Sequence, residues 1–126
     1  MIDHIDFAVK DLDRSRRFYT STLAALDVEP FMDIKTDEGR EGVGYGSLTG
    51  PQFWIGGGKA VEGRIHIAFV AKSRKAVDDF HRAALKVGGL CKGAPGLRPV
   101  YGDHYYAAFI IDPDGHTIEA VCRHYE

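Results

Sequence analysis

Two stretches of the chain, residues 2–9 and 65–70, alternate between apolar and other side chains at every second position. A period of two is typical of a strand that packs one face against a core. The core-facing sets are Ile5, Phe7 and Val9 in the first stretch and Ile65, Ile67 and Phe69 in the second. The opposite faces carry His4, Asp6 and Ala8, and His66, Ala68 and Val70. Each predicted strand therefore turns one histidine away from the core.

A pattern with helical spacing follows each of these strands. Asp11 or Asp13 is expected to cap the first helix and Ser73 the second, because their side-chain oxygens accept hydrogen bonds from free backbone N–H groups. The apolar stripes are Leu12, Tyr19, Leu23 and Leu26 in the first helix, and Val77, Phe80, Ala84 and Val87 in the second. Gly88 and Gly89 should end the second helix.

Strand-like segments follow each helix, at about 31–36, 42–48 and 52–56 and again at about 90–94, 105–111 and 116–122. The sequence DPDG at 112–115 predicts a hairpin turn between the last two of these segments. Pro113 presets its own φ, and Gly115 tolerates the left-handed conformation. The order strand, helix and three strands therefore occurs twice.

The two halves also share identical residues at a fixed offset of 62 positions. The identical pairs are His4 and His66, Ile5 and Ile67, Phe7 and Phe69, Lys10 and Lys72, Phe18 and Phe80, and Leu23 and Leu85. Identities at one offset, close to half the chain length, favour a duplicated module. We expect one α+β domain over 1–126, with βαβββ modules at about 1–58 and 63–126. If the two sheets combine, both histidines point into one cavity.

Composition narrows the class of protein. A chain of 126 residues is long enough for one domain with a core. The net charge of -2 is spread along the chain, which argues against nucleic-acid and membrane-surface partners. Apolar runs are too short for a membrane span, and the N-terminus has no leader pattern. Cys91 and Cys122 fit reduced thiols in a cytoplasmic protein.

Glu119 adds a third ionisable group to the two histidines. It lies in the middle of a predicted strand between apolar neighbours, where an unpaired carboxylate would be costly. Two imidazoles and one carboxylate on three strands are the ligands of a mononuclear divalent-metal site with open positions, for Fe, Mn, Ni, Zn or Co. The alternative is that His4, His66 and Glu119 make only structural hydrogen bonds.

Other candidate side chains gather in an aromatic-rich segment, VYGDHYYAAF at 100–109. His104 is a candidate acid or base at neutral pH, with Tyr101 as a second proton-handling group and Tyr106 as a substrate contact. An ordinary aromatic strand edge would look the same. Asp6 could orient a ligand imidazole or pair with an arginine. Trp54 could form a flat wall for a substrate or belong to the core.

The chain resembles the vicinal-oxygen-chelate superfamily, which comprises glyoxalases, bleomycin resistance proteins and dioxygenases. The resemblance rests on HIDFAVKDLDRSRRFY at 4–19, IHIAFVAKSRKAVDDFH at 65–81 and FIIDPDGHTIEAV at 109–121. It implies paired modules in a cup-shaped, partly open mixed sheet with helices outside, and two chains in one functional unit. It maps three metal ligands onto His4, His66 and Glu119.

Two departures from the family pattern separate this chain from familiar members. Glyoxalase-type lyases carry a fourth, glutamate ligand on the last strand of the first module, where this chain has Trp54. An indole offers no lone pair to a metal. Ring-cleaving dioxygenases carry a tyrosine ten residues before the carboxylate, where this chain has Phe109.

Together with the resemblance, these residues predict a metal-dependent enzyme that chelates two neighbouring oxygens of a small substrate, of the lyase, isomerase or dioxygenase type. The resemblance implies that it is a homodimer. The alternative is a metal-free dimer that binds a small molecule without catalysis, as bleomycin resistance proteins do. Whether the two modules complete one site within a chain or across two chains stays open at this stage.

Overall fold

The computed structural model describes residues 1–47 and 50–126, and it has the βαβββ order twice. The first module comprises β1 (Ile5–Val9), α1 (Leu12–Ala24), β2 (Glu29–Lys35), β3 (Glu41–Ser47) and β4 (Gly50–Gly57). The second comprises β5 (His66–Val70), α2 (Arg74–Lys86), β6 (Leu90–Leu97), the short 3-10 helix η1 (Pro99–Tyr101), β7 (Tyr106–Ile111) and β8 (Thr117–Cys122). The expected α+β fold of two βαβββ modules is confirmed. The strand expected at 42–48 corresponds to β3, and position 48 lies outside the described residues.

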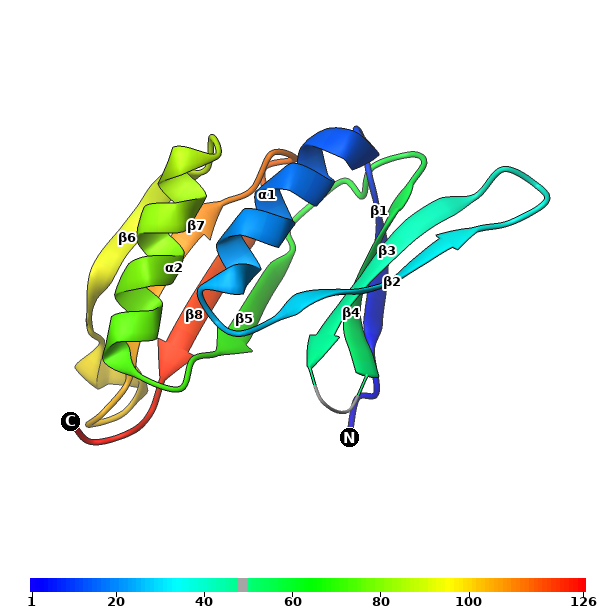
Figure 1. Ribbon diagram of the computed structural model, residues 1–126. Coiled ribbons are helices and arrows are strands. Elements are labelled where there is room, and N and C mark those ends of the chain that lie inside the picture. The colour runs from blue at the N-terminus through cyan, green and yellow to red at the C-terminus, as the bar shows by residue number, and fades with distance from the viewer. Residues whose placement is uncertain (48–49) are drawn as a thin grey trace.

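Each module forms its own four-stranded mixed sheet (Figure 1). The strand order is β1-β4-β3-β2 in the first sheet and β5-β8-β7-β6 in the second. The first strand of each module pairs in parallel with the last, and the other pairs are antiparallel. In the described residues, β1 and β5 are therefore both edge strands, each with one row of backbone groups free for another strand.

The sequence signals that begin and end the helices work as expected. The Asp11 side chain accepts a hydrogen bond from the Arg14 backbone N–H at 3.1 Å and caps α1. Ser73 caps α2 in the same way, by accepting from the Ala76 N–H at 3.0 Å. After α2 the chain turns at Gly88, whose φ of 93° lies in the left-handed region that favours glycine.

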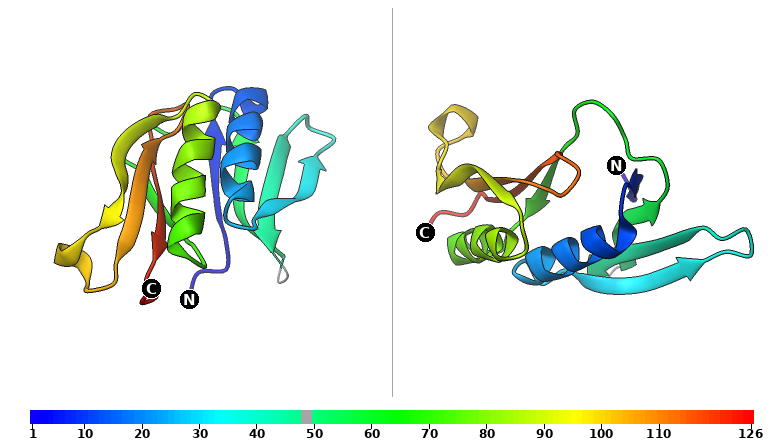
Figure 2. Two further views of the ribbon diagram at one scale, coloured as in Figure 1. Left: turned by 60° about the vertical axis from the view of Figure 1, so that its left-hand side comes forward. Right: turned by 90° about the horizontal axis from the view of Figure 1, so that it is seen from above.

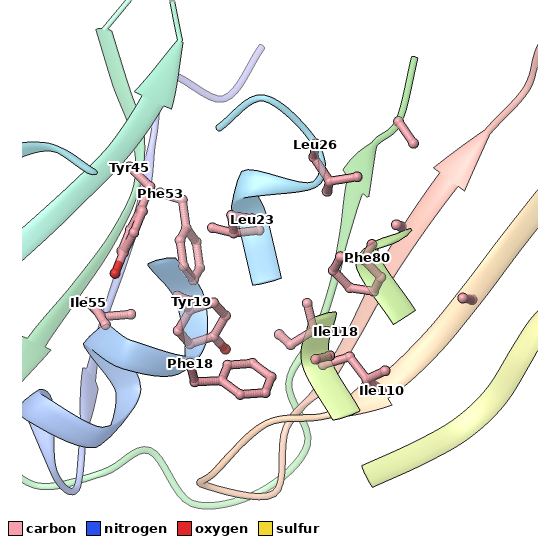
Figure 3. Packing of buried hydrophobic residues seen from close by; sticks show 14 of the residues in the cluster. Phe18, Tyr19, Leu23, Leu26, Tyr45, Phe53, Ile55, Phe80, Ile110 and Ile118 are labelled. Carbon is pink, nitrogen blue, oxygen red and sulfur yellow. The ribbon is translucent and has the colours of Figure 1, made fainter. Parts of the chain in front are cut away.

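The two helices lie side by side on one side of the sheets, and seen from above they leave the other side of the second sheet uncovered (Figure 2). A single hydrophobic cluster runs through both modules (Figure 3). Phe18 and Leu23 of α1 and Phe80 of α2 are fully buried in it. The apolar stripes of both helices thus bury against one shared core.

A polar contact ties the first helix to the hairpin turn of the second module. The hydroxyl of the buried Tyr19 donates to a carboxylate oxygen of Asp112. The other oxygen of Asp112 accepts the backbone N–H groups of Asp114 and His116, both at 2.9 Å. The DPDG turn between β7 and β8 is thereby held against α1. Within the described residues, no helix is long and apolar enough to cross a membrane.

Candidate functional site

A histidine and a glutamate meet on the uncovered face of the second sheet. His66 begins β5, and Glu119 lies in the middle of the neighbouring strand β8. The Nε2 atom of His66 is 2.7 Å from Oε1 of Glu119. The carboxylate side chain is 3% exposed, whereas the imidazole is 34% exposed. A buried carboxylate thus shares a hydrogen bond with an imidazole that solvent and ligands can reach.

The second oxygen of Glu119 is held by a phenol. Tyr105, just before β7, donates its hydroxyl hydrogen to Oε2. Burial, followed by the hydrogen bond and the negative charge of Glu119, raises the pKa of Tyr105 to about 12. The ring is flanked by the Arg123 guanidinium, 4.7 Å from its centroid, and by the Tyr101 ring at 5.3 Å. Tyr105 therefore keeps its proton at neutral pH and can donate it to one oxygen of the carboxylate.

Phe109 and two cationic side chains extend this face. The Phe109 ring contacts the His66 ring at a centroid distance of 5.9 Å, and the Arg98 guanidinium lies 5.5 Å from the Phe109 centroid. Lys92 Nζ donates to Thr117 Oγ1 at 2.7 Å. Thr117 is the residue of β8 that pairs with His66. An apolar ring and positive charges thus surround the His66–Glu119 pair.

His4, the third expected ligand, lies apart from this pair within the chain. It precedes β1 in the first sheet, and its Nδ1 atom is 2.6 Å from a carboxylate oxygen of Asp3. Its side chain is 53% exposed. The described part of the chain contains no group of three or more His, Cys, Asp or Glu side chains that could hold a metal ion. One chain therefore brings together two of the three expected ligands.

Trp54 and Asp6 also lie in the first sheet. They are register partners on the adjacent strands β4 and β1. Both line a hollow of about 330 Å³, together with Ile34 and Arg40. The indole packs over Gly44, where an added Cβ would lie 2.8 Å from ring atoms of Trp54. Like His4, these two candidates belong to a different sheet from the His66–Glu119 pair.

The structure divides the aromatic segment between the two faces of the second sheet. Tyr106 faces α2, where its hydroxyl donates to Asp78 Oδ1 at 2.7 Å and its ring contacts the Arg74 guanidinium. This side is opposite the His66–Glu119 pair. His104 is exposed, with its ring 5.0 Å from that of Tyr125 near the C-terminus. Of the candidates in this segment, Tyr101 is the one that reaches the site, through its contact with Tyr105.

Tyr105 belongs to the aromatic segment at 100–109 but is not among the residues that the sequence predicts for the site. The signal was available in the strand period, because residues 105, 107 and 109 share a face of β7 and Phe109 pairs with Glu119 across the hairpin. Lys92, Arg98 and Arg123 carried no comparable signal. The positions of Lys92 and Arg98 depend on the irregular register of β6, and Arg123 lies just beyond the end of β8.

Comparison with known proteins gives the family to which this chain belongs. The sequence profile of the Glyoxalase/Bleomycin resistance protein/Dioxygenase superfamily matches residues 1–120. The chain belongs to this superfamily. No curated protein sequence matches the chain.

Solved structures agree with this assignment. The chain is similar to a glyoxalase/bleomycin resistance protein from Albidiferax ferrireducens, with 31% identity, 98% of this chain and 99% of that chain covered, and a TM-score of 0.77. Two more distant structures share the fold. Glyoxalase I from Zea mays has 23% identity, covers 99% of this chain and 45% of its own, and gives a TM-score of 0.72. The other is a variant of the FosX fosfomycin resistance protein from Listeria monocytogenes, complexed with Mn(II) and 1S,2S-dihydroxypropylphosphonic acid. It has 21% identity, the match covers 96% of this chain and 90% of that chain, and the TM-score is 0.69.

Proposed function

We propose that this protein is a divalent-metal-dependent enzyme that acts on a small organic molecule through two neighbouring oxygens of that molecule. The observation that carries the proposal is the His66–Glu119 pair, with its two atoms 2.7 Å apart on an open sheet face. A buried carboxylate whose side chain is only 3% exposed is costly unless it is strongly paired. Superfamily membership over residues 1–120 supports the same class of function.

The donor chemistry fits a divalent cation. His66 Nε2 and Glu119 Oε1 are an imidazole nitrogen and a carboxylate oxygen, both suited to Fe, Mn, Ni, Zn or Co. Nε2 offers a lone pair in the neutral tautomer that carries its hydrogen on Nδ1, and the oxygen of the ionised carboxylate offers lone pairs of its own. When bound, the metal supplies Lewis-acid polarisation of the two substrate oxygens or gathers substrate and O₂ on adjacent positions.

Residues of this chain would supply the rest of the site. Tyr105 holds Oε2 of Glu119, so Oε1 is the oxygen left to face a ligand. A carboxylate oriented in this way keeps one donor atom fixed in position. Phe109 forms an apolar wall beside the His66 ring. Tyr101, beside Tyr105, is the proton-handling candidate nearest the pair.

The third ligand, His4, would come from a second copy of the chain. Support for this arrangement comes from the two edge strands β1 and β5, whose outer backbone groups have no partner strand in the described residues. Val70 on β5 is 79% exposed and Ile2, just before β1, is 72% exposed. Val70 also lines an open groove of about 1020 Å³, and Phe31 is another residue of its lining. Pairing two chains would cover these apolar positions and could bring His4 to the His66–Glu119 pair.

A metal-free binding dimer is the second candidate function. One observation favours it: His66, Glu119 and Tyr105 satisfy one another by hydrogen bonds without any further ligand. Such a closed set can persist as a structural element of a binding pocket. The aromatic and cationic side chains around it would then capture a ligand by contact alone.

Metal analysis of mixed dimers tests the proposal. Chains carrying His4→Ala and chains carrying His66→Ala are co-expressed with different histidine-free tags, and each kind of dimer is isolated. If each site takes His4 from one chain and His66 from the other, both variants alone lose the metal, while the mixed dimer keeps one intact site of its two. Elemental analysis should thus find about half of the wild-type metal content in the mixed dimer.

Two results would contradict parts of the proposal. A mixed dimer without metal, when the wild type binds one ion per chain, would refute the sharing of His4 between chains. Wild-type protein that stays free of Fe, Mn, Ni, Zn and Co after incubation with each ion would refute the metal-dependent function and leave the binding dimer. Glu119→Gln tests the carboxylate ligand, because this substitution keeps the side-chain volume of Glu119 and removes its negative charge.

A further inference from the structure

Three cationic side chains lie on the same sheet face as the His66–Glu119 pair. Lys92 contacts Thr117, the strand partner of His66. Arg98 lies over Phe109, whose ring contacts that of His66. Arg123 lies over Tyr105, which donates to Glu119. Each positive group is therefore one side chain away from the pair, and the three approach it from β6, from the loop after β6 and from the end of β8.

None of these cations forms an ion pair with a carboxylate in the described residues, whereas many basic residues elsewhere do. The only carboxylate in this group of contacts is Glu119, whose two oxygens are already taken by His66 and Tyr105. The excess of positive charge is local, because the chain as a whole has a net charge of -2. A concave or open face with unpaired charges of one sign attracts a ligand of the opposite sign.

The backbone beneath Arg98 leaves room for its guanidinium group. A Cβ added to Gly93 would lie 3.2 Å from one terminal nitrogen of Arg98, and a Cβ added to Gly96 would lie 3.1 Å from the other. The guanidinium also donates to the Ala94 carbonyl oxygen at 2.5 Å. Arg98 is thus held across β6 over two glycines, with one side against Phe109. A planar, immobilised guanidinium is well suited to bidentate recognition of a carboxylate or phosphoryl group.

We propose that the substrate of this site is a small organic anion, in which a carboxylate, phosphate or phosphonate group accompanies the pair of neighbouring oxygens. Arg98 and Lys92 bind the anionic group, and Arg123 adds to the positive potential. This inference rests on the proposed function, which places the two neighbouring oxygens of the substrate at the His66–Glu119 pair. The anion-binding part depends only on the cations, so it can be tested without a metal.

Matched ligand pairs separate the anionic group from the oxygen pair. Dihydroxyacetone phosphate is compared with dihydroxyacetone, and protocatechuate with catechol, by calorimetry on the metal-loaded protein. The anionic member of at least one pair should bind about tenfold more tightly, because a charge-assisted bidentate contact is added. The preference should shrink as salt is raised, because salt screens exposed charges. Equal affinities in both pairs would overturn the proposal.

Variants then assign the preference to these residues. Arg98→Gln and Lys92→Gln should each reduce the preference severalfold, while Arg98→Lys should recover part of it by restoring the charge. The control variant Lys86→Gln removes one positive charge from the end of α2, remote from this face, and should leave the preference unchanged. A preference that survives in the double variant Arg98→Gln/Lys92→Gln, confirmed as folded by circular dichroism, would also overturn the proposal.

A measurement without metal distinguishes failure of the anion-binding proposal from failure of the proposed metal site. Inorganic phosphate is titrated into protein kept in chelator, and amide shifts are followed by NMR. Shifts at β6 and at the ends of β7 and β8 that vanish in the double variant support the anion site even if no metal ever binds. Phosphate shifts that are absent, or that are identical in the double variant, contradict it whatever the metal analysis finds.

Discussion

Tyr105 donates its hydroxyl hydrogen to Oε2 of Glu119, and this contact fixes a carboxylate whose other oxygen lies 2.7 Å from His66 Nε2. The phenol approaches from the residue just before β7 and the carboxylate from the middle of β8. A strand-to-strand contact of this kind holds the glutamate in one rotamer. It also links the ionisation of Tyr105 to the stability of the fold.

Tyr105→Phe should change the response of the protein to alkali. The pKa of Tyr105 is raised to about 12 in the folded protein, against 10.0 for an ordinary tyrosine, chiefly by burial and then by Glu119. Between these values the unfolded chain has lost the proton and the folded chain has kept it, so stability falls as pH rises from about 10 to about 12. Denaturant melts over this range should show a shallower fall for the variant.

The absorbance of the tyrosine phenolate measures the ionisation of Tyr105 independently of stability. Tyr105→Phe should remove one tyrosine that titrates late in the folded protein. Tyr125→Phe is the matched control, because Tyr125 is 81% exposed. If Tyr105→Phe and Tyr125→Phe give the same titration curve, Tyr105 does not hold Glu119 in solution.

Tyr19→Phe should destabilise the junction of the two modules. The buried hydroxyl of Tyr19 donates to Asp112, which also accepts two backbone N–H groups of the hairpin turn. Removing one partner of a buried carboxylate leaves it less satisfied, at a cost of about 1–3 kcal/mol. Chemical denaturation measures the loss, with Tyr125→Phe again as control. A loss equal to that of the control would mean that water replaces the hydroxyl at no cost.

Much of this fold could be predicted from the sequence because its signals are local. Asp11 and Ser73 cap helices in the way that their side chains predict, and DPDG forms the turn between β7 and β8. The alternation along β1 correctly predicted that Phe7 and Val9 are buried, but the third residue expected on that face, Ile5, is 39% exposed. Each of these inferences needs only a few neighbouring residues.

The candidate site was less predictable because it depends on which sheet each residue joins. The repeat gave His4 and His66 equivalent positions, and the structure keeps them equivalent, but in two separate sheets. Periodicity cannot give the spacing between sheets. Glu119 was identified by its apolar neighbours, whereas Tyr105 and Tyr106 are adjacent in sequence and face opposite ways. Choosing between them required the register of the hairpin.

The two cysteines should differ sharply in reactivity. Cys91 is exposed, with its sulfur 3.1 Å from His81 Nε2, and Cys122 is fully buried. Burial lowers the pKa of the neighbouring His81 imidazole. Because only Cys91 is open to solvent, a disulfide reagent should modify one thiol per folded chain, and the second only after denaturation. Cys91→Ser should abolish the fast reaction, and a fast reaction that persists would place Cys122 within reach of solvent.

Gly44 should be the position that controls the environment of the single tryptophan. An added Cβ at Gly44 would lie 2.8 Å from three ring atoms of Trp54, closer than real Cβ contacts allow, so the indole must move. Gly57 on the neighbouring strand is the control, because a Cβ there meets nothing within 4 Å. Gly44→Ala should shift the tryptophan emission, and Gly57→Ala should leave it unchanged. Because Trp54 lies in the first sheet and the His66–Glu119 pair in the second, phosphate binding by the separate chain should survive Gly44→Ala. If instead Gly44→Ala weakens binding in the dimer but not in the separate chain, Trp54 of one chain lines the site of the other. The proposed pairing of His4 with the site of a second copy would bring Trp54 to that position.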